Sequence, residues 1–367
     1  MKSKLAYLCS SQSWGGLEMN HIRNAKWMAD LGYDTTVICV AGTPIEKYAQ
    51  ELNLTVHTIV PHKKYYDFKQ GKILSRYLSE NDFTHLLIRS TYDMSITAIV
   101  KRKLKDKIHT SYFMEMQLGV KKTNFLHTLR FKGIDLWSCP LNWLEEQVNT
   151  MTRFSNKTVV IPSGLDLSQF DTIVSQEEAR KALDLPRDAM IFGLIGRFDP
   201  QKGQLLLLEA MEKSKHKDYH VVLLGEPTKH EGEEYFEKME RVIQNELFKD
   251  RVHVRPFMKE VTTFFSAVDW FVMATKAETF GMVTIESLAA GTPVLGSNAG
   301  GTPEILQEGK GGRLFSTQNS TDLAKQIDAI CGENLKIEAR TLQNMAKVYD
   351  HNVITKMVAE ELNLVKN

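Results

Sequence analysis

Residues 191 to 210 read IFGLIGRFDPQKGQLLLLEA and contain the three parts of an α/β unit in a row. The apolar run 191–195 is typical of a buried strand in its length and its composition. A turn bounded by two glycines follows over 196–203, and a leucine-rich helix is predicted over 204–213. A strand, a glycine turn and a helix in this order indicate a parallel sheet that is covered by helices.

The same alternation of strands and helices continues in both directions along the chain. It predicts strands over residues 4–10, 35–40, 55–60, 85–89, 109–114, 191–195, 220–224, 252–254, 270–273 and 293–296. Apolar residues at helical spacing predict a helix over 17–31 that Gly32 ends. Thr302 is expected to cap a further helix, with Pro303 at its first helical position. Two successive runs of strands predict an α/β protein with two parallel-sheet domains, divided near residues 165–185.

The composition agrees with a globular protein of two domains. Hydrophobic residues make up 43% and charged residues 25% of the 367 residues, as in ordinary globular proteins, and about two domains are expected for this length. No apolar run approaches the roughly 18–20 residues that cross a bilayer, and the start of the chain is too short for the apolar region of a signal peptide. The cysteines are scattered and without metal-ligand spacing, so a cytoplasmic protein with reduced thiols and no structural metal is expected. They are Cys9, Cys39, Cys139 and Cys331.

Charge is unevenly distributed between the two halves of the chain. Residues 1–165 carry 22 Lys and Arg against 14 Asp and Glu (net +8), and residues 166–367 carry 24 against 31 (net −7), which together give the formal +1. A basic half favours an anionic partner, either a membrane surface or an acceptor that carries a pyrophosphate. Nucleic acid is not expected as a partner, because no recognisable binding module accompanies the charge.

Two clusters of basic residues stand out in this first half. The cations of residues 101–107 are expected to be a solvated helix end. A second cluster alternates basic and apolar side chains, which predicts a peripheral contact with an anionic membrane surface. It consists of Lys121, Lys122, Phe125, Leu126, Leu129, Arg130, Phe131 and Lys132.

Two carboxylates in the second half flank another glycine turn. Residues 277–286 read AETFGMVTIE, in which Glu278 precedes Gly281 and Glu286 lies in the predicted helix that follows. A helix N-terminus gathers unpaired N–H groups and partial positive charge, which favours an anion. A carboxylate can accept hydrogen bonds from two hydroxyls at once. The spacing therefore suits a ligand with a phosphate in its middle and hydroxyls at both ends, such as a nucleotide sugar.

Together these segments resemble the retaining glycosyltransferases of family 4. Glu278 and Glu286 are similar to the E-x7-E motif of that family, and residues 196–203 are similar to its G-R-x4-K-G phosphate motif. Residues 162–170 resemble its P-x-G-x-D…F signature between domains, and residues 13–18 resemble its N-terminal glycine loop. The resemblance implies the GT-B fold, in which two Rossmann-like domains face each other across a cleft.

In such a fold the C-terminal helix returns to the N-terminal domain. That domain would comprise residues 1–165 and 346–367 and bind the acceptor, and residues 166–345 would bind the nucleotide sugar. The last segment carries one apolar stripe that needs a partner. The stripe consists of Val353, Ile354, Met357, Val358, Leu362 and Val365.

The resemblance also implies a role for each residue of these motifs. Arg197 and Lys202 would bind the diphosphate and stabilise its charge as it departs, and Glu278 would contact the transferred sugar. Glu286 would bind the ribose hydroxyls. The other nucleotide-sugar-binding residues are expected to be Gly15, Gly16, Glu226, Met258, Thr279, Phe280, Gly281, Met282 and Val283.

One position departs from the family pattern. Many members carry a histidine near the end of the strand predicted over 109–114, and this chain has none there. Glu115 is the nearest polar candidate for a catalytic role, either orienting a substrate or merely capping the strand. His109 and His127 lie nearby, but the alternation of side chains along the strand makes neither a clear substitute for that histidine.

The expected function is retaining transfer of a hexose or N-acetylhexosamine from a nucleotide sugar, with UDP favoured, to a saccharide or lipid-linked acceptor in the synthesis of surface glycans or lipopolysaccharide. The nucleotide sugar is a substrate, no cofactor is expected, and no essential metal is expected because no convincing D-x-D motif ends a strand. A nucleotide-sugar epimerase of the same architecture and a non-catalytic nucleotide-sugar-binding subunit remain as alternatives. A dinucleotide-dependent oxidoreductase is disfavoured, because no G-x-G-x-x-G follows the first strand.

Overall fold

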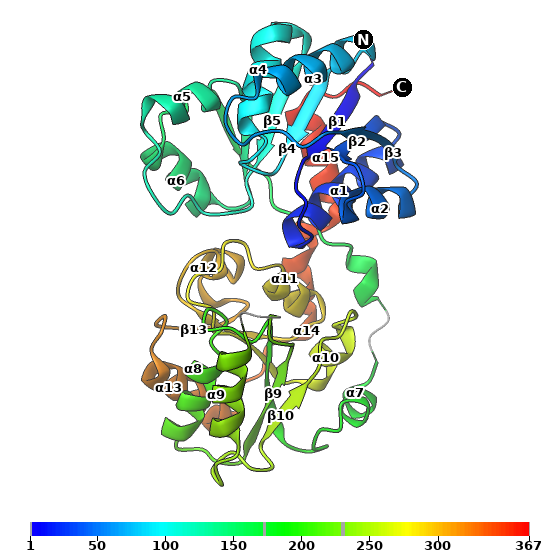
Figure 1. The fold of residues 1–367 in the computed structure, drawn as a ribbon. Coiled ribbons are helices and arrows are strands. Elements are labelled where there is room, and N and C mark those ends of the chain that lie inside the picture. The colour runs from blue at the N-terminus through cyan, green and yellow to red at the C-terminus, as the bar shows by residue number, and fades with distance from the viewer. Residues whose placement is uncertain (1, 172–173, 229–231, 367) are drawn as a thin grey trace. The chain divides into compact units, whose positions relative to one another are not determined.

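The computed structural model describes residues 2–171, 174–228 and 232–366 of two α/β units (Figure 1). Unit 1 comprises Met1–Gly164 together with His351–Asn367, and unit 2 comprises Leu165–Asp350. The sequence analysis places these divisions after residues 165 and 345, one and five residues away from the observed ones. Residues 172–173 of the predicted boundary region lie outside the described residues.

Within its described residues, unit 1 is built on a seven-stranded parallel sheet of order β3-β2-β1-β4-β5-β6-β7. Its strands are β1 (Lys4–Cys9), β2 (Asp34–Val40), β3 (Thr55–Ile59), β4 (His85–Ile88), β5 (His109–Phe113), β6 (Leu136–Cys139) and β7 (Lys157–Val160). The five strands that the sequence predicts here are confirmed to within one residue at each end. The sequence analysis does not predict β6 and β7, which the structure adds to this sheet.

Helices cover both faces of this sheet. They are α1 (Gly16–Asp30), α2 (Pro44–Glu51), α3 (Phe68–Glu80), α4 (Met94–Leu104), α5 (Phe125–Phe131), α6 (Asn142–Met151), α15 (His351–Glu361) and the 3-10 turn η1 (Lys105–Lys107). Alternate residues of β1 point to opposite faces, so that Leu5 and Tyr7 join the core beneath α1, whereas Ala6 and Leu8 join the core beneath α3 and α4. The predicted end of α1 is confirmed, since Gly32 has the left-handed φ of +91° that closes a helix.

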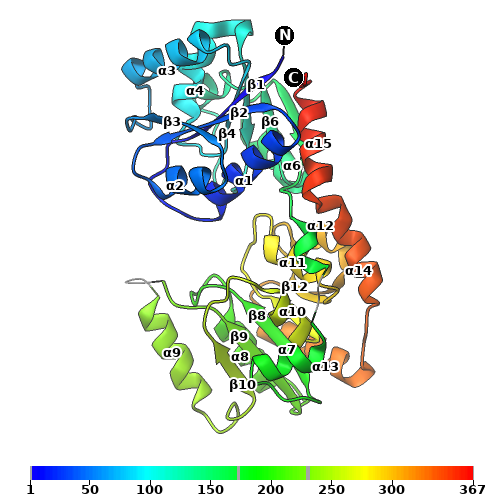
Figure 2. The ribbon, with the colours of Figure 1, turned by 90° about the vertical axis from the view of Figure 1, so that its right-hand side faces the viewer.

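The C-terminal helix α15 belongs to unit 1, as predicted, and packs against α1 (Figure 2, in red). Ile354, Val358 and Leu362 are buried in the core beneath α1. The apolar stripe is narrower than predicted, because Val353 is 44% and Val365 is 54% exposed. Helical phase explains the first of these, since residues 354, 358 and 362 recur every fourth position and 353 lies off that line.

In the part of unit 2 that the structure describes, a six-stranded parallel sheet has the order β10-β9-β8-β11-β12-β13. Its strands are β8 (Met190–Ile195), β9 (Tyr219–Leu224), β10 (Val252–Arg255), β11 (Trp270–Met273), β12 (Val294–Ser297) and β13 (Gly312–Phe315). The five predicted strands of this half are again confirmed to within one residue, and β13 is the addition. Its helices are α7 (Gln176–Ala182), α8 (Gln204–Lys213), α9 (Glu233–Ile243), α10 (Thr262–Ala267), α11 (Met282–Ala289), α12 (Thr302–Ile305), α13 (Ser320–Glu333) and α14 (Ala339–Ala346), with 3-10 turns η2 (Leu167–Phe170), η3 (Gln307–Gly309) and η4 (Lys347–Tyr349).

The start of α12 corrects one prediction. Gly301, not Thr302, is the N-cap, and Pro303 is the second helical residue rather than the first. The reason is a backbone contact, because the N–H of Gly301 donates to the carbonyl of Glu278 at 2.9 Å and fixes the chain one residue earlier. Thr302 is consequently buried as the first helical residue.

Each sheet has one place where the strand order reverses. In unit 1 it lies between β1 and β4, and in unit 2 it lies between β8 and β11. In open parallel sheets, the loops that follow the carboxyl ends of two such strands diverge and leave a crevice that binds ligands. The loops after β1, β4, β8 and β11 are therefore the first places to look for a site.

Candidate functional site

The loop after β8 carries the predicted phosphate motif and is held in shape by its own backbone. The Lys202 N–H donates to the Asp199 carbonyl at 3.1 Å, and the side chain of buried Gln204 donates to the Arg197 carbonyl at 2.9 Å. The alkyl stem of Lys202 packs over Gly196, where a Cβ would lie 3.2 Å from the Lys202 Cγ. This loop therefore presents the Lys202 ammonium from a braced position.

Lys202 meets Glu278, which follows β11 on the other side of the strand-order reversal. The Lys202 Nζ lies 3.1 Å from the Glu278 Oε2, and both side chains are about a quarter exposed, at 28% and 22%. The backbone of Glu278 pairs with Gly300 and accepts from Gly301. The structure thus brings together two of the four predicted catalytic residues at the position that the strand order marks.

Two glycines shape this part of unit 2. Gly203 caps α8 with a φ of +81°, and a Cβ there would lie 2.5 Å from the Ala274 carbonyl oxygen. Gly281 caps α11 with a φ of +83°, and no side chain caps that N-terminus in the described residues. Both positions require glycine because their φ is left-handed. The first-turn N–H groups of α11 are therefore available to an anion beside Lys202 and Glu278.

The other predicted residues of unit 2 lie around this centre with different exposure. Glu286 is half-buried on α11, one turn from its start, and Thr279, Met282 and Val283 are half-buried as well. The Phe280 ring is 4% exposed and packs edge-on against Tyr349, so that only its backbone can reach a ligand. Glu226 and Met258 follow β9 and β10; the Glu226 side chain is exposed, and its carbonyl accepts from the N–H of Phe198 at 3.0 Å.

Arg197 lies less close to this centre than the sequence predicts. Its side chain is 66% exposed, and its guanidinium lies 3.7 Å from a carboxylate oxygen of Asp199. An exposed pair at this distance contributes little to stability. The guanidinium is accordingly free to swing toward a ligand, but the structure does not bring it to Glu278 as it brings Lys202.

In unit 1, the predicted glycine loop follows β1 at the other strand-order reversal. Gly15 is the N-cap of α1 with an extended backbone, and a Cβ on Gly16 would meet no atom within 4 Å. Nothing within this unit therefore requires a glycine at either position. An open backbone is what a close approach to a ligand needs.

Glu115 forms an ion pair with Arg89 at the carboxyl ends of β4 and β5. The two side chains are 10% and 7% exposed, and the Ser163 hydroxyl donates to the same Glu115 oxygen at 3.0 Å. Burial lowers the pKa of Arg89 to about 10, so it stays protonated at neutral pH. Glu115 is therefore a held counter-ion in this structure, and its predicted catalytic role stays a prediction.

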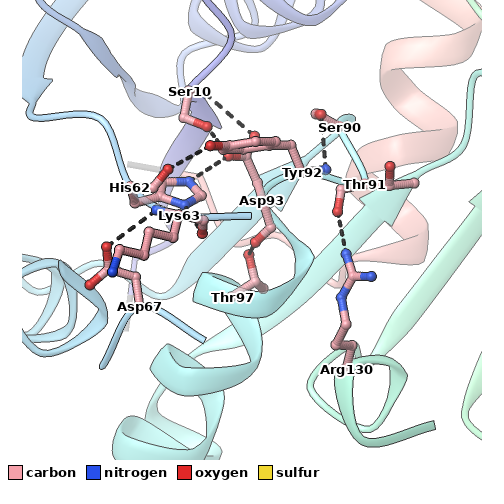
Figure 3. A network of polar contacts seen from close by, with 10 residues as sticks. All are labelled: Ser10, His62, Lys63, Asp67, Ser90, Thr91, Tyr92, Asp93, Thr97 and Arg130. Carbon is pink, nitrogen blue, oxygen red and sulfur yellow. Dashed lines mark hydrogen bonds and ion pairs between the residues drawn. The ribbon is translucent and has the colours of Figure 1, made fainter. Parts of the chain in front are cut away.

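A second buried network lies beside the end of β1 (Figure 3). The Asp93 carboxylate contacts the Ser10 hydroxyl and lies 2.9 Å from the His62 Nε2, while the His62 Nδ1 lies 2.9 Å from the Lys63 carbonyl. Burial on its own would lower the pKa of His62, but the hydrogen bonds and charge of Asp93 outweigh it, and the pKa lies above its usual value. This network ties the loop after β3 to the start of the glycine loop.

Sequence analysis did not find Arg89, Ser163, His62 or Asp93. A charged residue directly after the apolar run of β4 was the available signal for Arg89, because the carboxyl ends of buried strands carry functional side chains. His62 and Asp93 gave no local signal. They follow β3 and β4, which are not neighbours in the sheet, and they meet only through the loops after those strands.

The basic amphipathic cluster of unit 1 is also corrected. Phe125 is 75%, Leu126 59% and Leu129 40% exposed, as a surface patch requires, but Arg130 and Phe131 are buried at 3% and 2% exposure. The helix α5 is the cause, since it turns these two residues inward. The predicted helix end at residues 101–107 is confirmed, with Lys101 and Arg102 in the last turn of α4.

The described residues contain neither a metal-binding group nor a membrane-spanning helix. No group of three or more His, Cys, Asp or Glu side chains among them could hold a metal ion. None of their helices has both the length and the apolar character needed to traverse a lipid bilayer. The cysteines are free thiols, and burial raises the pKa of Cys39, Cys139 and Cys331 to between about 11 and about 12.

Residues 175–348 match the family model of glycosyl transferases group 1. A D-inositol 3-phosphate glycosyltransferase of Streptomyces scabiei is 32% identical over 180 residues, which cover 47% of this chain and 40% of that protein. The chain thus spans less than half the length of the curated relatives that it matches.

Solved structures resemble the chain over almost its whole length. HepE of Anabaena in complex with UDP has a TM-score of 0.83 at 20% identity, covering 98% of this chain and 99% of that chain. A glycosyltransferase from Rickettsia africae has a TM-score of 0.85 at 19% identity, covering 99% and 98%. These likenesses show the fold, and the predicted pair of Rossmann-like domains of GT-B type is confirmed.

Proposed function

We propose that the chain is a glycosyltransferase that takes a sugar from a nucleotide sugar at the Lys202–Glu278 centre of unit 2. The observation that carries the proposal is the contact of these two side chains at 3.1 Å, at the strand-order reversal of the sheet. It lies beside the N-terminus of α11, which has a glycine N-cap and no side-chain cap among the described residues. The match of residues 175–348 to a glycosyltransferase family model covers this whole centre. A UDP-sugar is the favoured donor, because HepE, a similar fold, binds UDP.

Each part of the donor would find a partner of suitable chemistry. The Lys202 ammonium and the N–H groups at the start of α11 would neutralise the diphosphate. Glu278 would accept hydrogen bonds from hydroxyls of the sugar, and Glu286 from those of the ribose. Gly15 and Gly16 of unit 1 would offer backbone N–H groups to the diphosphate, and Met258 and Glu226 would lie toward the base.

The reaction we propose retains the anomeric configuration. The bond between the anomeric carbon and the diphosphate oxygen breaks, and the acceptor oxygen bonds to that carbon from the same face. The acceptor's proton passes to the departing diphosphate, whose growing negative charge Lys202 and Arg197 stabilise. A sugar cation forms transiently, and Glu278 would hold its hydroxyls in place without forming a covalent bond. No cofactor and no essential metal ion enter this proposal.

We further propose that unit 1 binds the acceptor, a saccharide or lipid-linked saccharide of surface glycan or lipopolysaccharide synthesis, at a cytoplasmic membrane face. An open groove of about 580 Å³ in unit 1 favours a lipid-linked acceptor. Its walls combine Phe68, Leu126 and Leu129 with Lys101, Arg102 and Lys132. Exposed apolar surface with a basic rim is typical of contact with an anionic membrane surface.

A thermal-shift series in EDTA tests the donor assignment. UDP, GDP, ADP, NAD and several UDP-sugars are compared, and a ligand at a hundred times its Kd should stabilise the fold by about 2.7 kcal/mol. A shift with one nucleoside diphosphate, and a larger one with one of its sugars, is the expected result. A shift with NAD alone would overturn the proposal. Product analysis without any acceptor is a separate test, in which release of a free or isomerised sugar would indicate the epimerase instead.

A further inference from the structure

A second hollow in unit 1, apart from the apolar groove, is lined by cations without acidic partners. It measures about 60 Å³, and its lining includes Lys64, Lys122, His127, Arg130 and Trp137. These residues come from loops and elements at the carboxyl side of the sheet: Lys64 follows β3, Lys122 follows β5, and His127 and Arg130 lie on α5. This hollow therefore lies where open parallel sheets bind ligands.

Arg130 is the most unusual member of this group. Arg130 is only 3% exposed, and its Nε has no hydrogen-bond partner in the described residues. Among the described residues its guanidinium donates one hydrogen bond, from the Nη2 to the Thr91 carbonyl (Figure 3). The group lies 5.0 Å from the Tyr65 ring centroid. Burial of a guanidinium with five N–H donors and no carboxylate partner is unfavourable, and one carbonyl and one ring do not offset it.

The neighbours of Arg130 increase this cost. Burial lowers the pKa of Lys122, and the charges of Arg130 and Lys64 lower it further. Burial also lowers the pKa of His127, with Arg130 and Lys122 adding to the effect. None of Lys64, Lys122 and Arg130 forms an ion pair with a carboxylate in the part of the chain that the structure describes, since the ion pairs found there involve other cations.

A donor without a proton acceptor completes the lining. The indole Nε1 of Trp137, which is 1% exposed, has no hydrogen-bond partner in the described residues. An indole N–H can only donate. Three cations, an imidazole and an indole N–H all offer protons or positive charge to the same small space. One anion with several oxygens would satisfy them together.

We propose that Lys64, Lys122, His127 and Arg130 form a binding site for a phosphate group of the acceptor. The proposal deepens the function proposed above, on which it rests, because it names the chemical class of the acceptor: a phosphorylated compound rather than a neutral glycan. A phosphate offers oxygens that accept from a guanidinium, an ammonium and an indole at once. The phosphate belongs either to a soluble sugar phosphate or to a lipid whose hydrocarbon chain lies along the nearby apolar groove.

The test is binding of inorganic phosphate at constant ionic strength, measured by calorimetry and by thermal shift. A Lys202→Ala background removes one of the two cations, Lys202 and Arg197, that would bind phosphate at the Lys202–Glu278 centre, so binding there is weakened. In that background, phosphate should still raise the Tm, and Lys122→Gln should raise the Kd about tenfold or more. The exposed Lys103, on α4, gives the matched control, since Lys103→Gln removes the same charge without changing the Kd.

Arg130→Gln provides an independent signature. Because it removes an uncompensated buried charge, the ligand-free variant should be at least as stable as the parent protein while its response to phosphate is lost. Should this variant not fold, Lys122→Gln alone decides, because its side chain is partly exposed. Equal phosphate affinity in Lys122→Gln, or no phosphate response in the Lys202→Ala parent, would overturn the site.

Two further ligands identify the source of the phosphate. Glucose 6-phosphate and a short-chain alkyl phosphate are compared below the micellar concentration of the latter. Tighter binding of the alkyl phosphate, weakened by Leu129→Gln, assigns the site to a lipid, and tighter binding of the sugar phosphate assigns it to a soluble acceptor. The response of the unmodified protein to UDP is read in parallel, so that failure of the phosphate site and failure of the donor site are told apart.

Discussion

At the scale of single residues, Lys202 and Glu278 form an ion pair that a bound ligand would have to replace with its own contacts. In the structure each neutralises the other at 3.1 Å, and neither charge is deeply buried. A diphosphate would compete with Glu278 for the ammonium, while Glu278 would exchange Lys202 for sugar hydroxyls. The pair therefore holds both side chains at the place where the ligand would bind.

Replacement of these two residues should have different effects. Lys202→Ala removes a charge-assisted contact of about 1.5–3 kcal/mol, so the Kd for the nucleoside diphosphate should rise roughly tenfold to a hundredfold. Glu278→Ala should mainly lower kcat, because in the proposed function Glu278 contacts the transferred sugar and not the diphosphate. Calorimetry with the diphosphate and steady-state transfer rates measure the two effects. Lys310→Ala, an exposed lysine of the same unit, is the control, and near-normal transfer by Lys202→Ala would refute the phosphate role.

His62 offers a prediction about pH. Its folded pKa is raised, so its contribution to stability is fully present below the unfolded pKa of about 6.5 and is lost as the pH rises through the folded value. His62→Gln should therefore cost more free energy of unfolding at pH 5.5 than at pH 8.5. Urea unfolding of both proteins at the two values measures this difference. His57→Gln should show the opposite trend, because burial lowers the pKa of His57; the same trend in both variants would contradict the assignment.

At the scale of elements, the two glycine-capped helices α8 and α11 fix the donor centre more firmly than any side chain does. Gly203 and Gly281 have nearly the same left-handed φ, and each ends a loop that begins at the carboxyl end of a central strand. The phosphate loop and the Glu278 loop are joined by a hydrogen bond from the Lys276 N–H to the Gln201 carbonyl at 3.1 Å. The relative position of Lys202 and Glu278 therefore depends on the contact between the two loops that carry them.

Gly203→Ala tests this dependence on the backbone. The change introduces both a left-handed alanine, at about 1–2 kcal/mol, and a collision with the Ala274 carbonyl. Gly309→Ala is the matched control, since Gly309 has a φ of +107° but a Cβ there meets nothing within 4 Å. Urea unfolding should show a loss for Gly203→Ala that exceeds the loss for Gly309→Ala by at least about 1 kcal/mol. Equal losses would mean that the loop moves aside without cost.

At the scale of the whole molecule, unit 1 depends on a helix that arrives from the far end of the sequence. The His85 Nε2 lies 3.2 Å from the Leu362 carbonyl, and Lys157 forms an ion pair with Glu361 at 2.6 Å. Val358→Asp would place an unpaired carboxylate in the core beneath α1 and should lower the stability of unit 1 by about 3 kcal/mol or more. Val353→Asp, on the exposed side of the same helix, should change it by less than about 0.5 kcal/mol, and denaturant unfolding compares the two.

What could be predicted at this scale follows from how local each signal is. A few adjacent residues are enough to predict strands such as β8 and β11 and the glycine turns after them. For this reason the sequence analysis located these elements and the Lys202–Glu278 centre. The Arg89–Glu115 pair, the His62–Asp93 contact and the inward turn of Arg130 depend on the order of the strands in the sheet and on the phase of a short helix. Those facts are not carried by neighbouring residues, so the sequence of this chain did not reveal them.

The division of unit 1 into two chain segments has a consequence for biosynthesis. A ribosome completes Gly164 long before it reaches His351, and at about 5–20 residues per second the interval is roughly 10–40 s. During that time the surface that α15 will cover, around Ile22 and Met28 of α1, faces solvent. Unit 2, which is one continuous segment, emerges in full while unit 1 still waits for its final helix. The nascent chain therefore needs protection of this surface until α15 has emerged.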